Sequence, residues 1–346
     1  MAITIRPGAL DVDRDAAIGL FRRYLNEAYD DRRFEWLYRD NPAGPGRLWV
    51  AADDRTGEIV GTAGAFPREI RLEGREAVGW VLGDFCVAER YRALGPALAL
   101  QRRCLEDLAA TGAALFHDFP HPRLMPIYSR LRIGAPRLMR RLVRLLRVDD
   151  RVERMVGSTR LGRGLASAAN AILALRTRAG RPSPTAAIGF LEGGCGAEFS
   201  ELADKVGADY GICLRRGAAY VDWRYLRNPI RRHEIVTVHQ DGRLAAWAAL
   251  AQDGRTGALV DVFGVPDPEL IESAVEAAVA ALARRGCATV SVSLLDSHPW
   301  VALFRRLGFS PRESSPVILH PLPASGLSAS ALAAAPMFLT QGDHDS

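Results

Sequence analysis

A short basic segment with one glycine stands between an apolar run and a helical pattern, and its spacing suits the binding of a diphosphate. The apolar run, residues 78–87, predicts a strand, and leucines recur at helical spacing from Leu94 until Gly112. Between them lies Arg92-Ala93-Leu94-Gly95-Pro96-Ala97. The first turn of a helix offers backbone N–H groups and a positive dipole to phosphates, although Pro96 removes one N–H. The same residue types also make ordinary structural turns, so both interpretations stay open.

The elements around this turn follow an order that is repeated later in the chain. Trp36, Tyr38, Asn41 and Pro42 form a Trp-x-Tyr-x-x-Asn-Pro pattern, which returns at residues 223–229. In both copies a two-stranded hairpin follows, and then come a strand, a helix, a further strand and a His-Pro pair. The chain is therefore predicted to be a tandem duplication of one α/β unit, with too few units for a solenoid.

Differences between the two copies indicate function, because features of the fold should survive in both. In place of the arginine and glycine turn, the second copy has Val265-Pro266-Asp267-Pro268-Glu269-Leu270. Its carboxylates would repel a diphosphate, and its prolines lack an N–H. Tyr128, in the helix after the first His-Pro pair, becomes Phe304, which keeps the ring but loses a proton donor. The second copy is therefore predicted to be non-catalytic, and the shared tryptophans and tyrosines to serve packing.

Composition argues against several classes of protein. The 346 residues carry a net charge of +5, but the arginines are dispersed without interleaved aromatic residues, so nucleic-acid binding is not expected. The five cysteines form no CxxC pair, which predicts reduced thiols and no metal site. The amino terminus lacks a signal-peptide pattern, and the longest apolar stretch, residues 165–175, is too short to span a bilayer. We expect a cytoplasmic protein without stable membrane insertion.

The region between the copies contains a segment with two interpretations. Residues 137–147 mix arginines with leucines, which suits either a membrane surface or a strand or connector packed on the core. We favour the strand or connector. Residues 159–178 predict a helix, and a stretch rich in glycine and proline follows at 180–196.

The strand, the Arg-x-x-Gly-x-Ala turn, the helix, and a later helix that carries Tyr128 together resemble the GNAT superfamily of acyl-CoA-dependent N-acyltransferases. The resemblance covers both halves. It implies an α/β fold of two tandem GNAT-like units, each a mixed, mostly antiparallel twisted sheet flanked by helices. The expected divisions are a catalytic acyl-CoA-binding domain at 1–148, a helical linker at 149–197, a degenerate GNAT-like domain at 198–322, and a partly disordered tail at 323–346.

The resemblance also implies a cofactor, acetyl-CoA or another short acyl-CoA. Its diphosphate would be held by Arg92, Ala93, Leu94, Gly95 and Ala97. The backbone of Phe85, Cys86 and Val87 would pair with the pantetheine arm, and the N–H of Val87 would polarise the thioester carbonyl. Removing such a donor from an acyl-transfer site lowers the rate by about 10²–10³.

The implied reaction is direct attack on the thioester by a primary amine of a small molecule or an amino sugar. The resemblance suggests Asp84 as the general base, acting through water, although Asp84 could also be a structural carboxylate. His117 and Asp118 are alternatives for the base or for substrate recognition, and Tyr38 and Trp36 could also line the substrate cleft. Tyr128 would protonate the leaving thiolate, or would be a core aromatic residue.

Two questions stay open at this stage. A non-catalytic CoA-binding regulator or scaffold is the alternative to an enzyme. The protein could be a monomer or a homodimer, because the second unit could cover the face that a homodimer partner would use.

Overall fold

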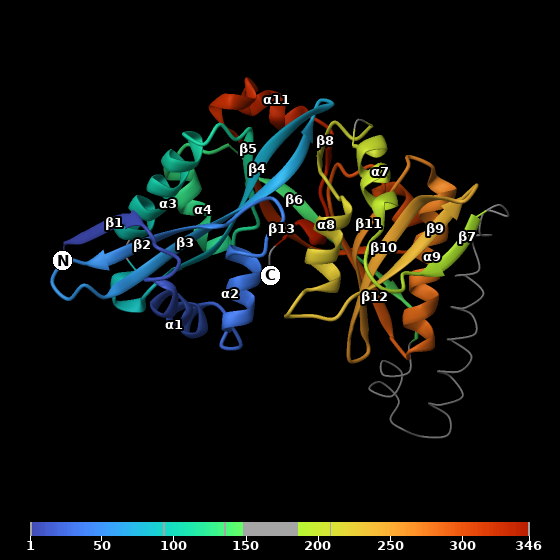
Figure 1. The fold of residues 1–346 in the computed structure, drawn as a ribbon, viewed down its shortest axis with the longest axis horizontal. Helices are drawn as coiled ribbons and strands as arrows, with labels where there is room; N and C mark the ends of the chain where they lie inside the picture. Colours follow the sequence, from blue (N-terminus) through green and yellow to red (C-terminus); the bar gives the residue numbers. More distant parts are fainter. Residues whose placement is uncertain (1, 93, 135, 148–185, 208, 345–346) are drawn as a thin grey trace.

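A computed structural model describes residues 2–92, 94–134, 136–147, 186–207 and 209–344. The predicted helix at 159–178 and most of the predicted linker therefore lie outside the described residues. One twisted sheet runs through both halves, with the strand order β1-β2-β3-β4-β5-β13-β6-β12-β11-β10-β9-β7 (Figure 1). Two short strands, β8 and β14, lie off this path. The predicted α/β class is confirmed.

The first half places its helices on both faces of the sheet. Phe21 of α1 and Phe34 of α2 pack on one face, and Leu100 of α3 and Tyr128 of α4 pack on the other. Side chains that alternate along each strand supply both cores. The elements are β1 (Ile3–Pro7), α1 (Arg14–Tyr24), α2 (Asp31–Tyr38), β2 (Arg47–Asp53), β3 (Ile59–Leu72), β4 (Arg75–Val87), η1 (Glu89–Tyr91), α3 (Leu94–Ala109), β5 (Leu115–Asp118), η2 (Pro122–Leu124), α4 (Met125–Arg130) and β6 (Arg137–Leu145).

The second half repeats the hairpin, strand, helix and strand of the first, as the duplicated pattern predicts. Its main helix, α9, is apolar along one side and packs against the sheet through residues such as Leu270 and Leu282. The elements are β7 (Ala186–Phe190), α7 (Ala197–Val206), β8 (Ile212–Leu214), α8 (Ala218–Val221), η3 (Asp222–Leu226), β9 (Glu234–Gln240), β10 (Arg243–Asp253), β11 (Thr256–Gly264), α9 (Pro268–Arg284), β12 (Thr289–Leu295), α10 (Val301–Arg306), β13 (Ser310–Pro321), η4 (Pro323–Ser325), α11 (Ala329–Ala334), β14 (Met337–Phe338) and η5 (Gln341–Asp343).

The two halves exchange their last strands. β6 follows the first unit in sequence but pairs antiparallel with β12 of the second, with Met139 opposite Leu295. β13 follows the second unit but pairs antiparallel with β5 of the first, with Ile318 opposite Asp118. Both exchanged strands meet in the middle of the sheet (Figure 1). Neither half therefore completes its own sheet, and divisions drawn along the sequence do not separate two independent units in space.

The arginine and leucine segment at 137–147 contains this exchanged strand. Arg144 is 3% exposed and bonds to Glu276, and Arg141 pairs with Glu313. Leu142 lies in the core. These contacts support the strand interpretation over the membrane surface. Among the described residues, no helix has the length and apolar character needed to cross a membrane.

The carboxy-terminal segment differs from the predicted partly disordered tail. Residues 323–344 run through η4, α11, β14 and η5 and end against the second half. Thr340 and Asp343 are fully buried, and Asp343 accepts hydrogen bonds from the equally buried Arg216 at 2.8 and 2.9 Å. The segment is rich in alanine and serine, which suggested disorder, but this buried ion pair anchors it.

The two tryptophans of the repeated pattern join the halves. The rings of Trp36 and Trp223 stack with centroids 4.8 Å apart. Each indole N–H donates to the backbone carbonyl of the other tryptophan, at 2.8 and 2.9 Å. Both residues are buried, so the prediction that they serve packing is confirmed. Trp36 lines a separate groove and not the cavity at the candidate active site, so its alternative role in substrate binding stays a prediction.

Candidate active site

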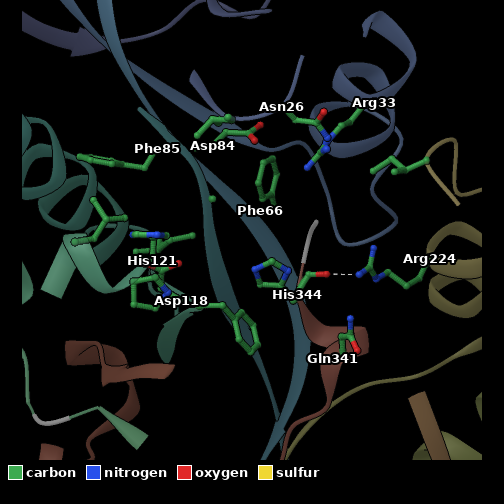
Figure 2. A pocket seen from close by; sticks show the side chains of 18 of the residues that line it. Asn26, Arg33, Phe66, Asp84, Phe85, Asp118, His121, Arg224, Gln341 and His344 are labelled. Atoms are coloured by element: carbon green, nitrogen blue, oxygen red, sulfur yellow. Dashed lines mark hydrogen bonds between the residues drawn. The ribbon is translucent and has the colours of Figure 1, made fainter. Parts of the chain in front are cut away.

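A cavity of about 540 Å³ lies where the two halves and the carboxy-terminal segment meet. Figure 2 shows Phe85, Asp118 and His121 on one side and Arg33, Arg224 and Gln341 on the other. Asp84 and His344 also line it. The cavity therefore combines the predicted catalytic half with a wall built by the second copy. Its ionisable lining residues include Arg33, Asp84, Asp118, Tyr128, Arg224, Arg231, His233 and His344.

A β-bulge aims Asp84 into this cavity. The register between β3 and β4 shifts near Thr62 and Gly64, so that Asp84 and Phe85 face a single residue of β3. Asp84 has a φ of 46°, in the left-handed region that a residue with a side chain rarely adopts. The pairing of β4 with β5 covers only 79–81 and 115–117, so β5 gives the end of β4 no partner. The bulge therefore points the Asp84 carboxylate into the cavity, next to a stretch of β4 backbone that β5 does not pair with.

Two buried phenols hold the Asp84 carboxylate. Tyr29 and Tyr38 donate to its Oδ2 at 2.8 and 3.1 Å. Burial, and next the charge of Asp84, raise the pKa of both phenols, so they stay protonated donors at neutral pH. Tyr38 is fully buried and does not line the cavity, so the structure gives it a positioning role instead of the predicted substrate contact.

Tyr128 and Asp118 form a hydrogen-bonded pair at the opposite wall. The Tyr128 hydroxyl, on α4, donates to Asp118 Oδ2 at the end of β5, and Gln101 Nε2 lies 3.5 Å from the same hydroxyl. Burial raises the pKa of Asp118 to about 7, partly offset by hydrogen bonds from Tyr128 and from the Phe119 backbone. Burial and the charge of Asp118 raise the pKa of Tyr128 well above its usual value. Both residues line the cavity, so a proton can be shared at its wall.

His117 faces away from this site. Neighbouring residues of a strand point to opposite faces of the sheet, so only one of His117 and Asp118 can enter the cavity. His117 is fully buried, and its Nε2 lies 3.3 Å from the Asp343 carbonyl. It does not line the cavity. The catalytic role predicted for His117 is therefore wrong for this geometry.

The predicted diphosphate turn lies at the amino-terminal end of α3. The helix begins at Leu94, so the N–H groups of Leu94 and Gly95 fall in its unpaired first turn, whereas the N–H of Ala97 can already bond within the helix. Gly95 is exposed, and a Cβ there would meet no atom within 4 Å. Arg92 is exposed, and its Nε donates to the Val87 carbonyl at 3.1 Å. Ala93 lies outside the described residues.

The thiol beside the open edge of β4 is not set up as a nucleophile. Cys86 is buried, its Sγ lies 3.2 Å from Thr62 Oγ1, and burial raises the pKa of the thiol to about 12. Almost no thiolate is present at neutral pH. This state disfavours a covalent acyl-cysteine and agrees with direct attack by an acceptor.

The matching place in the second copy is filled. Asp261 corresponds to Asp84 and accepts a hydrogen bond from Tyr225 at 2.8 Å, as Asp84 does from Tyr38. Asp261 also accepts from Arg216 and from Thr340 of the carboxy-terminal segment, both at 2.8 Å. All three of these partner side chains are buried, and a Cβ on Gly342 would come within 2.2 Å of the Tyr225 hydroxyl. The carboxy-terminal segment therefore occupies the space that is open in the first copy.

Sequence reasoning missed most of the wall that the second copy contributes. Arg224, Arg231 and His233 line the cavity, and so does His344, whose ring meets that of Phe119 edge-on at 4.7 Å. One signal was present, because Arg224 stands in the repeated pattern where the first copy has Leu37. No local pattern predicts that His344 lines the cavity, because its position depends on where the end of the chain folds back.

Comparison with known proteins identifies the first half. Residues 6–132 match the acetyltransferase (GNAT) domain family. This region is a GNAT domain. It carries the bulge at Asp84, the start of α3 and Tyr128, so the GNAT match covers every predicted catalytic and cofactor-binding position. No curated protein matched the sequence.

Solved structures extend the GNAT fold to both halves. A probable N-acyltransferase from Enterococcus faecalis V583 matches with a TM-score of 0.66 at 12% identity, over 93% of this chain and 73% of that one. A GCN5-related N-acetyltransferase from Anabaena variabilis matches with 0.65 at 12%, over 92% and 72%. A tandem GNAT protein from the clavulanic acid biosynthesis pathway matches with 0.57 at 14%, over 94% and 100%. The predicted tandem GNAT architecture is confirmed.

Proposed function

We propose that this GNAT protein transfers an acyl group from acyl-CoA, with acetyl-CoA as the first candidate, to a primary amine of a small molecule or an amino sugar. The observation that carries the proposal is the bulge in β4. It turns Asp84 into the cavity and leaves the following backbone without a partner from β5, beside a wall that carries Tyr128. The GNAT match of this half supports acyl transfer as the reaction class.

The residues at the end of β4 and the start of α3 fit the two parts of an acyl-CoA. The open edge at Phe85, Cys86 and Val87 offers backbone groups to the pantetheine arm, and the uncrowded first turn of α3 at Leu94 and Gly95 offers N–H groups to the diphosphate. Bound there, acyl-CoA would supply a thioester carbon for attack. The exposed Arg92 would add a positive charge near the phosphates.

Asp84 would make the acceptor nucleophilic. A free amine has a pKa near ~10, so about one molecule in a thousand is unprotonated at neutral pH. Asp84, held by Tyr29 and Tyr38, would take a proton from the ammonium group through water. A positioned base commonly contributes about 10²–10⁴ to the rate.

Tyr128 and Asp118 would complete the proton balance. As the amine nitrogen bonds to the carbonyl carbon and the carbon–sulfur bond breaks, the Tyr128 hydroxyl would protonate the departing thiolate. Asp118 in its protonated form would return a proton to the phenol, because the two groups already share a hydrogen bond. The nitrogen would release its second proton to water as the amide forms, and Asp118 would regain a proton from water after the reaction. Asp118 thus gains a role behind Tyr128, in addition to its place in the cavity wall.

Calorimetry and thiol release test this function. Titration with acetyl-CoA should show binding that Arg92→Glu abolishes, and thiol release should occur with a panel of primary amines. Tyr128→Phe should lower kcat with little change in acetyl-CoA affinity. Absence of binding at millimolar acetyl-CoA would overturn the proposal. Binding without thiol release would favour the alternative, a non-catalytic CoA-binding protein.

A further inference from the structure

Positive side chains gather on the cavity wall that the second copy builds. Arg224 comes from η3 and Arg231 from the loop after it, and Arg33 of α2, in the first copy, lines the same cavity. Figure 2 shows Arg33 and Arg224 on the side of the cavity away from Asp118. The carboxylates of Asp84 and Asp118 belong to β4 and β5. Arg33 and Arg224 therefore lie across the cavity from the Asp118 carboxylate.

Arg224 is buried without a counter-charge among the described residues. It is 3% exposed, its Nε donates to the Gly342 carbonyl at 2.7 Å, and its Nη2 donates to the His344 carbonyl. Its Nη1 is buried with no hydrogen-bond partner in the described part of the chain. No described carboxylate forms an ion pair with it. A buried guanidinium in this state is costly unless an anion joins it.

A second buried arginine shows what a purely structural guanidinium looks like in this protein. Arg216 is fully buried and pairs with both Asp261 and Asp343 at 2.8 Å. Its charge is balanced within the fold. Arg224 is comparably buried, but its hydrogen-bond partners in the described part of the chain are neutral carbonyls, and the Trp36 ring lies 5.5 Å from its guanidinium carbon. Among the described residues, Arg224 therefore keeps a charge that an anionic ligand can balance.

A comparison of the two copies in sequence also singles out Arg224. Arg224 occupies the position of Leu37 in the repeated pattern, and Leu37 is fully buried in the core of the first half. Replacing a buried leucine by a buried arginine lowers the stability of a fold unless an opposite charge pairs with the guanidinium. Arg224, unlike Leu37, borders the cavity that contains Asp84 of the first copy. Arg224 therefore differs from its counterpart in the first copy, and it lies at the candidate active site.

Neighbouring groups extend the positive wall. Asn228 accepts the N–H groups of Ile230 and Arg231 at 2.8 and 3.0 Å, which shapes the loop that carries the exposed Arg231. Burial, and next the charge of Arg224, lower the pKa of His233 to about 4. His233 is therefore neutral at pH 7 and can donate or accept a hydrogen bond.

We propose that the acceptor amine carries a carboxylate or phosphate, and that Arg224 and Arg231 bind this anion while the amine faces Asp84. The inference rests on the proposed acyl transfer and names its substrate class. A planar guanidinium suits both oxyanions because it can donate two parallel hydrogen bonds. Acceptors with a second positive charge, such as polyamines, would be repelled by this wall.

Matched acceptors test the anion site. Thiol release from acetyl-CoA should be compared for glucosamine and glucosamine 6-phosphate, and for ethanolamine, phosphoethanolamine and β-alanine. At least one anionic amine should exceed its neutral counterpart about tenfold or more in kcat/KM, and the phosphate and carboxylate arms identify the group. Arg224→Leu, which restores the residue of the first copy, should reduce this preference by about 10–100-fold, mainly through KM.

The matched control is Arg227→Gln. Arg227 is exposed, lies three residues further along, and lines a shallow groove outside the cavity, so its loss removes the same charge but should keep the preference. Equal rates for neutral and anionic amines would overturn the anion site and leave acyl transfer standing. If no amine releases thiol, acyl transfer fails, and calorimetry with inorganic phosphate on wild type and Arg224→Leu decides the anion site alone. Binding of phosphate that Arg224→Leu does not weaken would overturn it.

Discussion

Asp118→Asn should change how the stability of the protein depends on pH. Asp118 is 8% exposed, and burial raises its pKa from the usual 3.8 to about 7. An acid with a raised pKa in the folded state holds its proton more tightly there than in the unfolded chain. Its contribution to stability is therefore fully present below about pH 4 and is lost as pH rises through 7.

The size of the effect follows from that shift. Between the two pKa values, each pH unit lowers the free energy of unfolding by about 1.4 kcal/mol. From pH 5 to pH 8, Asp118 should therefore remove about 2–3 kcal/mol from the wild-type stability. The amide of Asp118→Asn does not titrate and keeps an oxygen that can accept from Tyr128. The variant should lose this part of the pH dependence.

Urea unfolding at pH 5, 6, 7 and 8 measures the difference between the two proteins. Tyr128→Phe removes a hydrogen bond that lowers the pKa of Asp118, so its loss of stability should continue to higher pH than in the wild type. Asp107→Asn is a control without pH dependence in this range: burial opposes the shift, but hydrogen bonds from Arg103 and Trp49 lower the pKa of Asp107 below its usual 3.8, so its contribution to stability should stay constant from pH 5 to 8. If wild type and Asp118→Asn keep a constant difference from pH 5 to 8, Asp118 is ionised throughout and cannot supply a proton to Tyr128.

Three further variants probe other parts of the argument. Asp84→Asn should lower kcat by about 10²–10⁴, with acetyl-CoA affinity by calorimetry unchanged, because only proton removal is lost. Trp36→Ala should destabilise the protein by about 3–5 kcal/mol in urea unfolding, since it deletes the ring stacked on Trp223 and one of the two reciprocal hydrogen bonds. Gly342→Ala should speed hydrogen exchange of the carboxy-terminal segment, because its Cβ would collide with the Tyr225 hydroxyl, whereas Gly19→Ala, with no atom near its Cβ and no positive φ, should leave that segment unchanged.

Local patterns in the sequence predict much of this fold, because they depend on neighbours a few residues apart. The hairpin turn at Glu73 and Gly74 shows this, since both residues adopt the positive φ that such a turn needs. The duplication adds information that a single copy lacks. It separates the tryptophans that pack the halves together from Tyr128, which only one copy has, and this separation agrees with their places in the structure.

The failures come from contacts between distant parts of the chain. β6 and β13 are both plausible last strands for either sheet, and the sequence contains no signal that they change places. The two residues that end β5 both seemed to face the cleft, because the phase of alternation along a four-residue strand cannot be read without its partners. The alanine and serine content of the last residues predicted disorder. The order of this segment depends on Asp343, whose buried partner, Arg216, lies far away in the sequence.

The two copies together indicate how one site was kept and the other closed. The bond from Tyr38 to Asp84 has its counterpart in the bond from Tyr225 to Asp261, so this pairing belongs to the fold and does not by itself make a site. At Asp261 a buried guanidinium is also present, and protonating that carboxylate would leave Arg216 short of one counter-charge in the interior. We therefore expect no catalytic role for Asp261, whose surroundings are filled by Arg216 and by the segment that ends the chain. What the second copy retains is a surface, and our proposal gives Arg224 on that surface the role of recognising an acceptor for the acyl transfer proposed for the first copy.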